Sequence, residues 1–192
     1  MSISILFMGP VGAGKTQAIR TISDLHALDT DRRTTCATRL LKPTTTVAMD
    51  MGSLQLTSTD KLRLLGTPGQ ARFDFMWDIL LKQASGVILM INHSSADPVA
   101  DLEHHLSAIE QRSPTRPLPM VVAVTHTDLA PQRSLDLYHA HLQARGCASL
   151  PVLATDARDK RQVQQALIAL AAQLNLTSAT RAAAFPKAAR LH

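Results

Sequence analysis

The stretch "ISILFMGPVGAGKTQAI", residues 3–19, decides the fold of this chain. An apolar run leads into "GPVGAGKT", Gly9 to Thr16, which fits the pattern G-x-x-x-x-G-K-[ST] in full, and a helix-compatible run follows. Glycines let the backbone wrap tightly, so that its N–H groups and the first turn of the helix face an anion. The stretch therefore predicts a strand, loop and helix that bind the phosphates of a nucleotide.

Within this loop, Lys15 and Thr16 have side chains suited to particular tasks. We expect the ammonium group of Lys15 to place a positive charge on the terminal phosphates, and the hydroxyl of Thr16 to ligate Mg²⁺. The full set of candidate phosphate-binding residues is Gly9, Val11, Gly12, Ala13, Gly14, Lys15 and Thr16.

The rest of the chain alternates between short apolar runs and amphipathic segments. The predicted strands are 3–9, 46–57, 61–66, 86–92, 119–125 and 150–155, and the predicted helices are 15–24, 73–84, 98–112, 134–145 and 161–175. This alternation predicts an α/β domain with a six-stranded, mostly parallel sheet flanked by helices. Only a few residues separate the runs at 46–57 and 61–66, too few for a parallel crossover, so we expect one antiparallel edge strand.

Length and composition bound the possibilities further. With 192 residues, 45% of them hydrophobic, and a mean hydropathy of +0.02, the chain can bury the core of one domain. We predict a nucleotide-binding domain at 1–176 and a basic, disordered tail at 177–192. The net charge of +5 falls partly in that tail, so the body is only mildly basic, and we expect small phosphorylated ligands and no nucleic acid.

We expect a cytoplasmic protein with no stable membrane anchor. The start, "MSISILFMGP", has no features of a secretion leader, and no apolar run reaches the roughly 18 residues that cross a bilayer. Neither the cysteines nor the histidines have the spacing of a metal site, and surface positions are expected for the helical histidines. These residues are Cys36, Cys147, His104, His105, His139 and His141.

Two further motifs stand at predicted strand ends: "GTPGQ" at 66–70 and "THTD" at 125–128. With them, residues 1–176 resemble a Ras-like small GTPase, and most of all the bacterial MglA-type group found with Roadblock-type partners, in which "TTTVAMD" (44–50) is a familiar phrase. The resemblance implies a P-loop NTPase fold of the Ras-like type. It also implies binding of GTP and GDP with Mg²⁺.

The resemblance assigns the reading of the base to two loops. "THTD" corresponds to the base-reading motif, so Thr125, His126 and Asp128 are candidate nucleotide contacts, with the Asp128 carboxylate accepting from the ring N–H and exocyclic amine of guanine. His126 stands where the family has lysine, and its ring could stack on the base. In "TDAR" (155–158), Ala157 would offer its N–H to guanine O6 with Arg158 beside it, although a simple strand-to-helix turn also explains this stretch.

The resemblance also assigns the hydrolytic residues. Thr46, with Thr45 as the alternative, would ligate Mg²⁺ and contact the γ-phosphate. The N–H of Gly69 would contact the same phosphate, and Gln70 would orient the attacking water as the catalytic residue. The implied activity is GTP hydrolysis, slow without an activating partner.

Two residues depart from the Ras-like pattern. Gly66 occupies the position of a magnesium-directing aspartate. Asp50 follows Thr46 by four residues, about 13 Å along an extended strand at roughly 3.3 Å per residue, so we expect it to be out of reach. Val11 stands where Ras-like proteins often have glycine; its branched side chain either slows hydrolysis or is a tolerated variant, since only backbone is needed to bind phosphate.

Aromatic residues are scarce but cluster after Gln70. Phe73, Phe75 and Trp77 lie within five positions, and they cannot all face inward from one helix. Some must pack under that helix, which is their simplest role, but we expect at least one to be exposed. Because aromatic residues anchor interfaces, residues 70–77 are the predicted surface for a Roadblock-type regulator and an effector.

The sequence thus predicts a guanine-nucleotide-dependent switch in bacterial polarity, motility or signalling. A first alternative is a non-hydrolysing nucleotide-binding scaffold, in which Gly66 and Val11 have abolished useful hydrolysis. A second is an ATP-using P-loop kinase, although the chain shows no arginine-rich, lid-like insertion.

Overall fold

The computed structural model describes residues 3–24, 50–57, 60–69 and 75–184, with side chains up to residue 175. In chain order the elements are β1 (Ile3–Met8), α1 (Lys15–Ile22), β2 (Asp50–Gln55), β3 (Lys61–Gly66), α2 (Phe75–Gln83), β4 (Gly86–Asn92), α3 (Pro98–Arg112), β5 (Met120–Thr125), a 3-10 turn (Thr127–Leu129), α4 (Asp136–Ala144), β6 (Val152–Ala154) and α5 (Lys160–Ala184).

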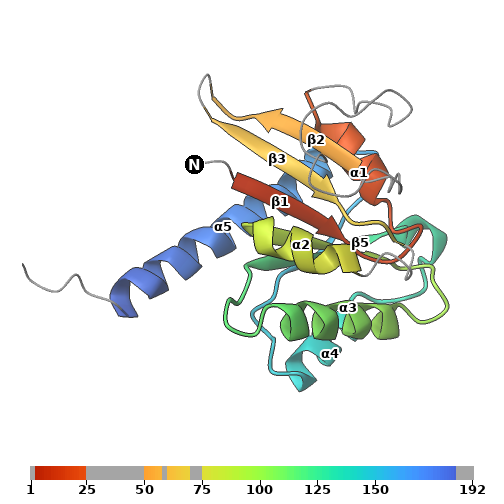
Figure 1. Cartoon of the computed structure of the whole chain (residues 1–192). Helices are drawn as coiled ribbons and strands as arrows, with labels where there is room; N and C mark the ends of the chain where they lie inside the picture. The colour runs from red at the N-terminus through yellow and green to blue at the C-terminus, as the bar shows by residue number, and fades with distance from the viewer. Residues whose placement is uncertain (1–2, 25–49, 58–59, 70–74, 185–192) are drawn as a thin grey trace, which may run out of the picture.

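In the described part of the chain, six strands form one sheet in the order β2-β3-β1-β4-β5-β6 (Figure 1). β1 pairs in parallel with both β3 and β4, and the pairs β4–β5 and β5–β6 are parallel as well. Only β2 runs antiparallel, against β3, with Asp50 opposite Gly66. The predicted α/β architecture and its antiparallel edge strand are confirmed.

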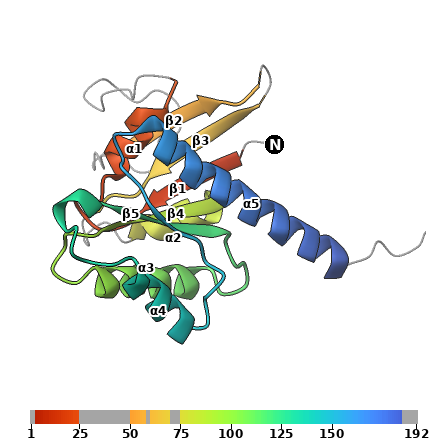
Figure 2. The same cartoon turned by 180° about the vertical axis from the view of Figure 1, so that it is seen from behind.

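Helices cover both faces of the sheet, because successive side chains of a strand point to opposite faces. On one face, Ile5 and Phe7 of β1 join the core beneath α1 and α5. On the other face, Leu6 and Met8 join the core beneath α2, α3 and α4. Figures 1 and 2 show these two layers from opposite sides. The central strands are therefore apolar on both faces, as a doubly covered parallel sheet requires.

Local signals set the helix boundaries that the sequence predicts. The Asp97 carboxylate accepts a hydrogen bond of 2.9 Å from the Ala100 N–H, and Pro98 opens α3. Along α5, Val163 and Leu170 are buried against the sheet, as the spacing of apolar residues predicts.

The C-terminal helix corrects the predicted tail. α5 continues to Ala184, so the expectation of disorder from residue 177 is wrong for 177–184, and residues 185–192 lie outside the described part. Figure 2 shows α5 crossing the back of the sheet and continuing past its edge. The division of the chain at residue 176 stays a prediction.

The helical histidines are not all at the surface as expected. His105 is buried in α3, with its Nδ1 2.8 Å from the Asp101 carbonyl oxygen, and burial lowers its pKa. His104 and His139 are exposed. His105 therefore belongs to the packed face of α3, and the expectation of a surface position is wrong for this residue.

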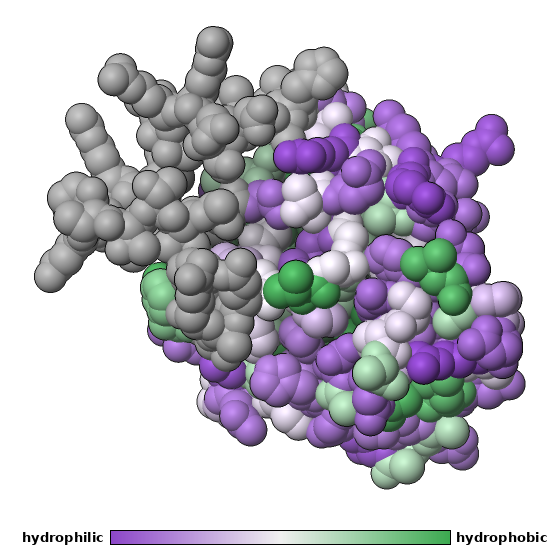
Figure 3. Space-filling model, turned by 90° about the vertical axis from the view of Figure 1, so that its right-hand side faces the viewer, coloured by the Kyte–Doolittle hydropathy of each residue, from purple (hydrophilic) through white to green (hydrophobic). Residues whose placement is uncertain are grey.

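On the face shown in Figure 3, hydrophobic side chains are scattered among hydrophilic ones. None of the described helices combines the length and apolar character that crossing a membrane requires.

Candidate nucleotide-binding site

The loops that carry the predicted site residues follow the carboxyl ends of β1, β3, β5 and β6. In an open α/β sheet these ends share one edge, which is where ligands bind. Gly14 shows how tightly the loops meet: a Cβ built there would lie 3.1 Å from Ala157 Cβ and 4.0 Å from Thr125 Cγ2. The structure therefore brings the phosphate loop together with both predicted base-reading loops.

The phosphate loop has the backbone of an anion cradle. Gly12 and Gly14 have positive φ angles of 77° and 88°, a left-handed conformation that glycine adopts without strain. Helix α1 starts at once with Lys15, so the unpaired N–H groups of its first turn face the loop. Such a helix start favours a bound phosphate.

Lys15 is held inside this loop. Its Nζ donates hydrogen bonds of 2.8 Å to the Gly9 carbonyl oxygen and 2.7 Å to that of Pro10, and the side chain is buried. Burial lowers the pKa of Lys15 to about 8, against the opposing effect of the Asp50 carboxylate. The ammonium charge therefore lies in a poorly solvated place, where its attraction to phosphate is strong.

The Thr16 hydroxyl donates a hydrogen bond to the Asp50 carboxylate, a contact between the phosphate loop and β2. The expectation that Asp50 is out of reach is therefore wrong. That expectation counted the distance along the strand from Thr46, whereas antiparallel pairing with β3 places Asp50 opposite Gly66, at the strand end that faces the phosphate loop.

Gly69 lies directly against the phosphate loop. A Cβ at this position would come within 2.9 Å of Val11 N and Cα and within 3.0 Å of Lys15 Nζ, so only glycine fits. Thr67 donates its N–H to the Phe7 carbonyl at 2.9 Å, which extends the β1–β3 pairing to this turn. Val11 is 65% exposed.

Three of the residues predicted to contact the nucleotide or the metal fall outside the described part of the chain. They are Thr45, Thr46 and Gln70, so their roles stay predictions.

On the base side, Thr125 acts as a brace. It is buried, and its hydroxyl lies 3.0 Å from the Ala13 carbonyl oxygen and 3.2 Å from that of Ile91. His126 has a left-handed φ of 57°, with Nδ1 2.9 Å from the Thr125 hydroxyl oxygen. Thr125 therefore joins the base-side loop to the phosphate loop and holds the turn that presents Asp128.

Asp128 and the "TDAR" loop are neighbours. Arg158 Nη2 lies 2.8 Å from Asp156 Oδ2 and 3.6 Å from Asp128 Oδ2. The hydrogen bonds from Arg158 hold the pKa of Asp156 down at about 2. Ala157 is buried, and its carbonyl oxygen accepts a 2.7 Å hydrogen bond from the Thr21 hydroxyl of α1. The two predicted base-reading segments thus lie side by side.

The donors at the phosphate end suit magnesium in a nucleotide complex. No group of three or more His, Cys, Asp or Glu side chains in the described ranges could hold a metal ion. Magnesium does not need such a cage when phosphate is present, because it binds one or two protein oxygens, phosphate oxygens and water. The oxygens of Thr16 and Asp50 fit that pattern.

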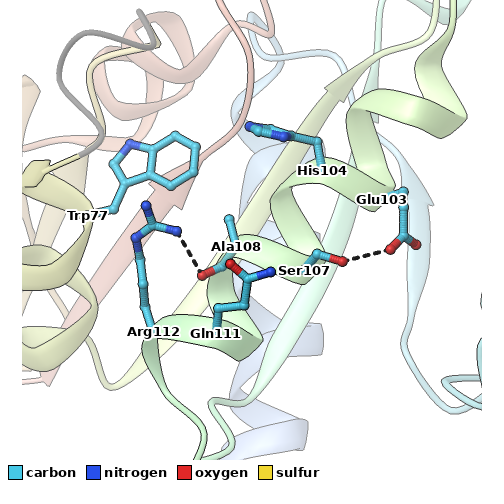
Figure 4. Close-up of a pocket in the computed structure, with 7 residues that line it drawn as sticks. All are labelled: Trp77, Glu103, His104, Ser107, Ala108, Gln111 and Arg112. Carbon is cyan, nitrogen blue, oxygen red and sulfur yellow. Dashed lines mark hydrogen bonds between the residues drawn. The ribbon is translucent and has the colours of Figure 1, made fainter.

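A pocket between α2 and α3 was not foreseen from the sequence. It has a volume of about 280 Å³ and contains none of the predicted nucleotide-binding residues. As Figure 4 shows, Arg112 lies against the Trp77 indole, with its guanidinium carbon 5.2 Å from the ring centroid. The pocket is lined by Trp77, Glu103, His104, Ser107, Ala108, Gln111 and Arg112.

A glycine-rich loop between a central parallel strand and a helix defines the class: the protein is a P-loop nucleotide-binding protein. A family model described as "Conserved hypothetical ATP binding protein" matches residues 39–185, and the chain belongs to this family. The match begins after the phosphate loop, so the loop supports nucleotide binding independently of the family match.

One relative is the uncharacterized protein MJ1339 of Methanocaldococcus jannaschii. It is 27% identical over 106 residues, which cover 54% of this chain and 65% of that protein. The chain thus spans just under two thirds of the length of this relative.

Proposed function

We propose that this protein is a Ras-like small GTPase of the MglA type, which binds GTP or GDP with Mg²⁺ and hydrolyses GTP slowly. One observation carries the proposal: the Thr125 hydroxyl contacts the Ala13 carbonyl, which ties the loop bearing Asp128 to the phosphate cradle. This contact supports a single site that combines a carboxylate suited to guanine with a cradle suited to phosphate.

Each residue has a defined task in the proposed site. The loop N–H groups and Lys15 bind the phosphates, and Thr16 and Thr46 hold the metal. Mg²⁺, when bound, neutralises charge on the phosphate oxygens. Gly69 offers its N–H to the γ-phosphate, and Gln70 orients the attacking water. Because Thr46 and Gln70 lie outside the described residues, these two assignments rest on the sequence.

Asp128 distinguishes the purines by hydrogen-bond chemistry. Guanine presents a ring N–H and an amine, which both donate to a carboxylate, whereas adenine presents a ring nitrogen that accepts.

A second candidate function, ATP binding, is favoured by the description of the family.

The nucleotide that co-purifies with the full chain separates these two functions. The protein is purified without added nucleotide and denatured, and the released ligand is identified by chromatography. Calorimetry with GTP, GDP and ATP in magnesium buffer then ranks the affinities. We expect GDP or GTP in the released fraction and tighter binding of both than of ATP; a preference for ATP would reject the guanine assignment.

Hydrolysis is tested separately from binding. In single-turnover assays with GTP, we expect slow conversion to GDP by the wild type and faster conversion by Val11→Gly, because the branched side chain no longer crowds the attacking water. If tightly bound GTP remains intact in both proteins, the non-hydrolysing scaffold is the better description.

The proposal includes a Roadblock-type partner that binds residues 70–77. In the described part of this segment and the helix that follows it, Phe75 is 56% exposed and Ile79 39% exposed, whereas Trp77 is buried. Phe75 and Ile79 are four positions apart and so share one face of α2. Co-elution with a purified Roadblock-type protein should occur with GTP and be lost in Phe75→Ser.

A further inference from the structure

We propose that His93, the residue that directly follows β4, positions the loop that carries Asp128 and thereby sets the preference for guanine. This inference rests on the proposed function, because it takes Asp128 as the group that reads the base. It deepens that function by naming a buried positioning residue that acts through Asp128.

His93 contacts both ends of the base-reading loop, which we define as residues 125–133. Its backbone N–H donates a 2.9 Å hydrogen bond to the Thr125 carbonyl oxygen, where the loop begins. Its ring Nε2 lies 3.1 Å from the Arg133 carbonyl oxygen, where the loop ends. Both ends of the loop are therefore held by one residue, and Asp128 lies between them.

Arg133 contacts His93 in return. Its Nη1 donates hydrogen bonds of 2.7 Å to the carbonyl oxygens of His93 and Ser95. Hydrogen bonds from a charged guanidinium are stronger than those between neutral groups. The end of the base-reading loop is therefore fixed to the segment that follows β4 by its backbone and by its side chain.

The partners of the His93 ring also fix its orientation. The Arg133 carbonyl oxygen can only accept, so Nε2 carries the hydrogen. Nδ1 lies 2.8 Å from the hydroxyl oxygen of the buried Tyr138. Burial raises the pKa of Tyr138 to about 12, so its hydroxyl keeps its proton and donates it to Nδ1. Each ring nitrogen thus has a partner, and the ring is locked between α4 and the loop.

The position of Asp128 depends on this loop backbone. The Asp128 side chain is 61% exposed, so packing does little to hold it. Hydrogen bonds to guanine require donor–acceptor distances of roughly 2.7–3.2 Å, and a shift of about 1 Å takes the carboxylate out of that range. A loop released at its Arg133 end should therefore read the base less well, while the phosphate loop is unaffected.

The first experiment compares two amide variants of His93 that each keep one ring contact. The longer amide of His93→Gln can donate to the Arg133 carbonyl, as Nε2 does, whereas the shorter amide of His93→Asn can accept from Tyr138, as Nδ1 does. Binding of GDP and ADP to the full chain is measured by competition with a fluorescent nucleotide. We expect His93→Asn to bind GDP about tenfold more weakly, with ADP changed less than about twofold, and His93→Gln to keep most of the preference for GDP.

A matched control removes the other hydrogen bond of the same ring. Tyr138→Phe keeps the aromatic packing and leaves the contact between His93 and Arg133 in place. It should lower the unfolding temperature, as His93→Asn does, but keep the preference for GDP. Thermal unfolding establishes that each variant is folded, and if His93→Asn is not, Arg133→Met removes the link from the other side and should weaken GDP binding in the same way.

A double variant tests whether His93 acts through Asp128. In the Asp128→Ala background, His93→Asn should cause no further loss of GDP affinity, because the group that it positions is gone. A role confined to the stability of the fold would lower the affinity by the same factor in both backgrounds.

The outcomes separate the inference from the proposed function. If the wild type prefers GDP and His93→Asn keeps the full preference, the inference is overturned and the GTPase proposal stands. Equal losses with and without Asp128 would also overturn it. If the wild type binds ADP as tightly as GDP, the guanine assignment itself fails, and the task given to His93 fails with it.

Discussion

The two ends of the candidate site are built differently. At the phosphate end, Lys15 is only 6% exposed and is fixed by two carbonyl oxygens of its own loop, and Thr16 is joined to Asp50. At the base end, the side chains of Asp128 and Arg158 are 61% and 69% exposed, and their nitrogen and oxygen atoms are 3.6 Å apart. One end is packed and the other is open to solvent.

This difference indicates how binding energy is divided between affinity and selectivity. A buried, prearranged charge contributes strongly to the binding of any nucleotide, because little reorganisation is needed. An exposed carboxylate contributes mainly once the base excludes water from it. Changes at the phosphate end should therefore lower all affinities together, while changes at the base end should alter the preference among nucleotides.

The largest effect is expected for Lys15→Ala. Removing the buried charge from its phosphate partner should cost about 2 to 5 kcal/mol of binding free energy, or roughly 30- to 5,000-fold in Kd, equally for GTP and ATP. Calorimetry with both nucleotides measures this change, with Lys61→Ala at the exposed start of β3 as the control. An effect on only one nucleotide would break the division between the two ends.

Asp128→Ala should have the next largest effect, on the base alone. Each charge-assisted hydrogen bond is worth about 1.5 to 3 kcal/mol, so losing both bonds to guanine should weaken GTP binding by at least roughly 10- to 150-fold. Binding of ATP should change little. Competition between GTP and ATP for the variant measures the ratio, which Lys15→Ala should leave unaltered. An unchanged ratio in Asp128→Ala would mean that another group reads the base.

The pH dependence of binding should report the phosphate end only. With the Lys15 pKa near 8 in the free protein and raised by bound phosphate, the complex holds more protons than the free protein above pH 8. Affinity for GDP without magnesium should therefore fall as pH rises above 8, by up to about tenfold per unit.

The same pKa shift also affects folding, with a defined sign. Between pH 8 and 10.5 the unfolded chain binds more protons at Lys15 than the folded protein does, so the free protein gains stability from this group as pH rises.

Fluorescence titrations of GDP at several pH values test the effect of pH on binding, and Lys15→Ala should abolish that effect. A flat profile for the wild type would show that Lys15 does not titrate in this range.

Arg158→Gln should have the smallest effect. Its ion pairs with Asp156 and Asp128 are at the surface, where solvent screens such pairs strongly, so GTP affinity should change less than about fivefold. Calorimetry and thermal unfolding measure both consequences. A much larger loss of affinity, with unchanged unfolding, would place Arg158 in direct contact with the nucleotide.

Features that depend on one short stretch of sequence could be predicted, whereas features that depend on how two stretches pair in space could not. The phosphate loop is one unbroken stretch from Gly9 to Thr16, and the buried strands show as apolar runs, so the class of fold and the cradle were accessible. The nearness of Asp50 to Thr16 depends on the register between two strands, which no count along one strand reveals. The roles of Thr46 and Gln70 stay predictions.

Two other differences between the predicted and the observed structure, the length of α5 and the burial of His105, have a signal in the sequence. Residues 177–184, "TSATRAAA", lack an apolar stripe but are rich in alanine, the strongest helix former, and α5 runs through them. His105 lies three positions after Leu102 and one before Leu106, both buried, so helical spacing places it on the inner face of α3.

The opposition of Asp50 and Gly66 in one ladder bears on how nucleotide-binding chains are recognised. Two residues that face each other across antiparallel strands have Cβ atoms only about 4.5 to 5.5 Å apart, so a functional group on one strand can reach a point that its neighbour would otherwise serve. A search template that reads a single strand would discard such a chain, whereas one that scores cross-strand pairs would retain it.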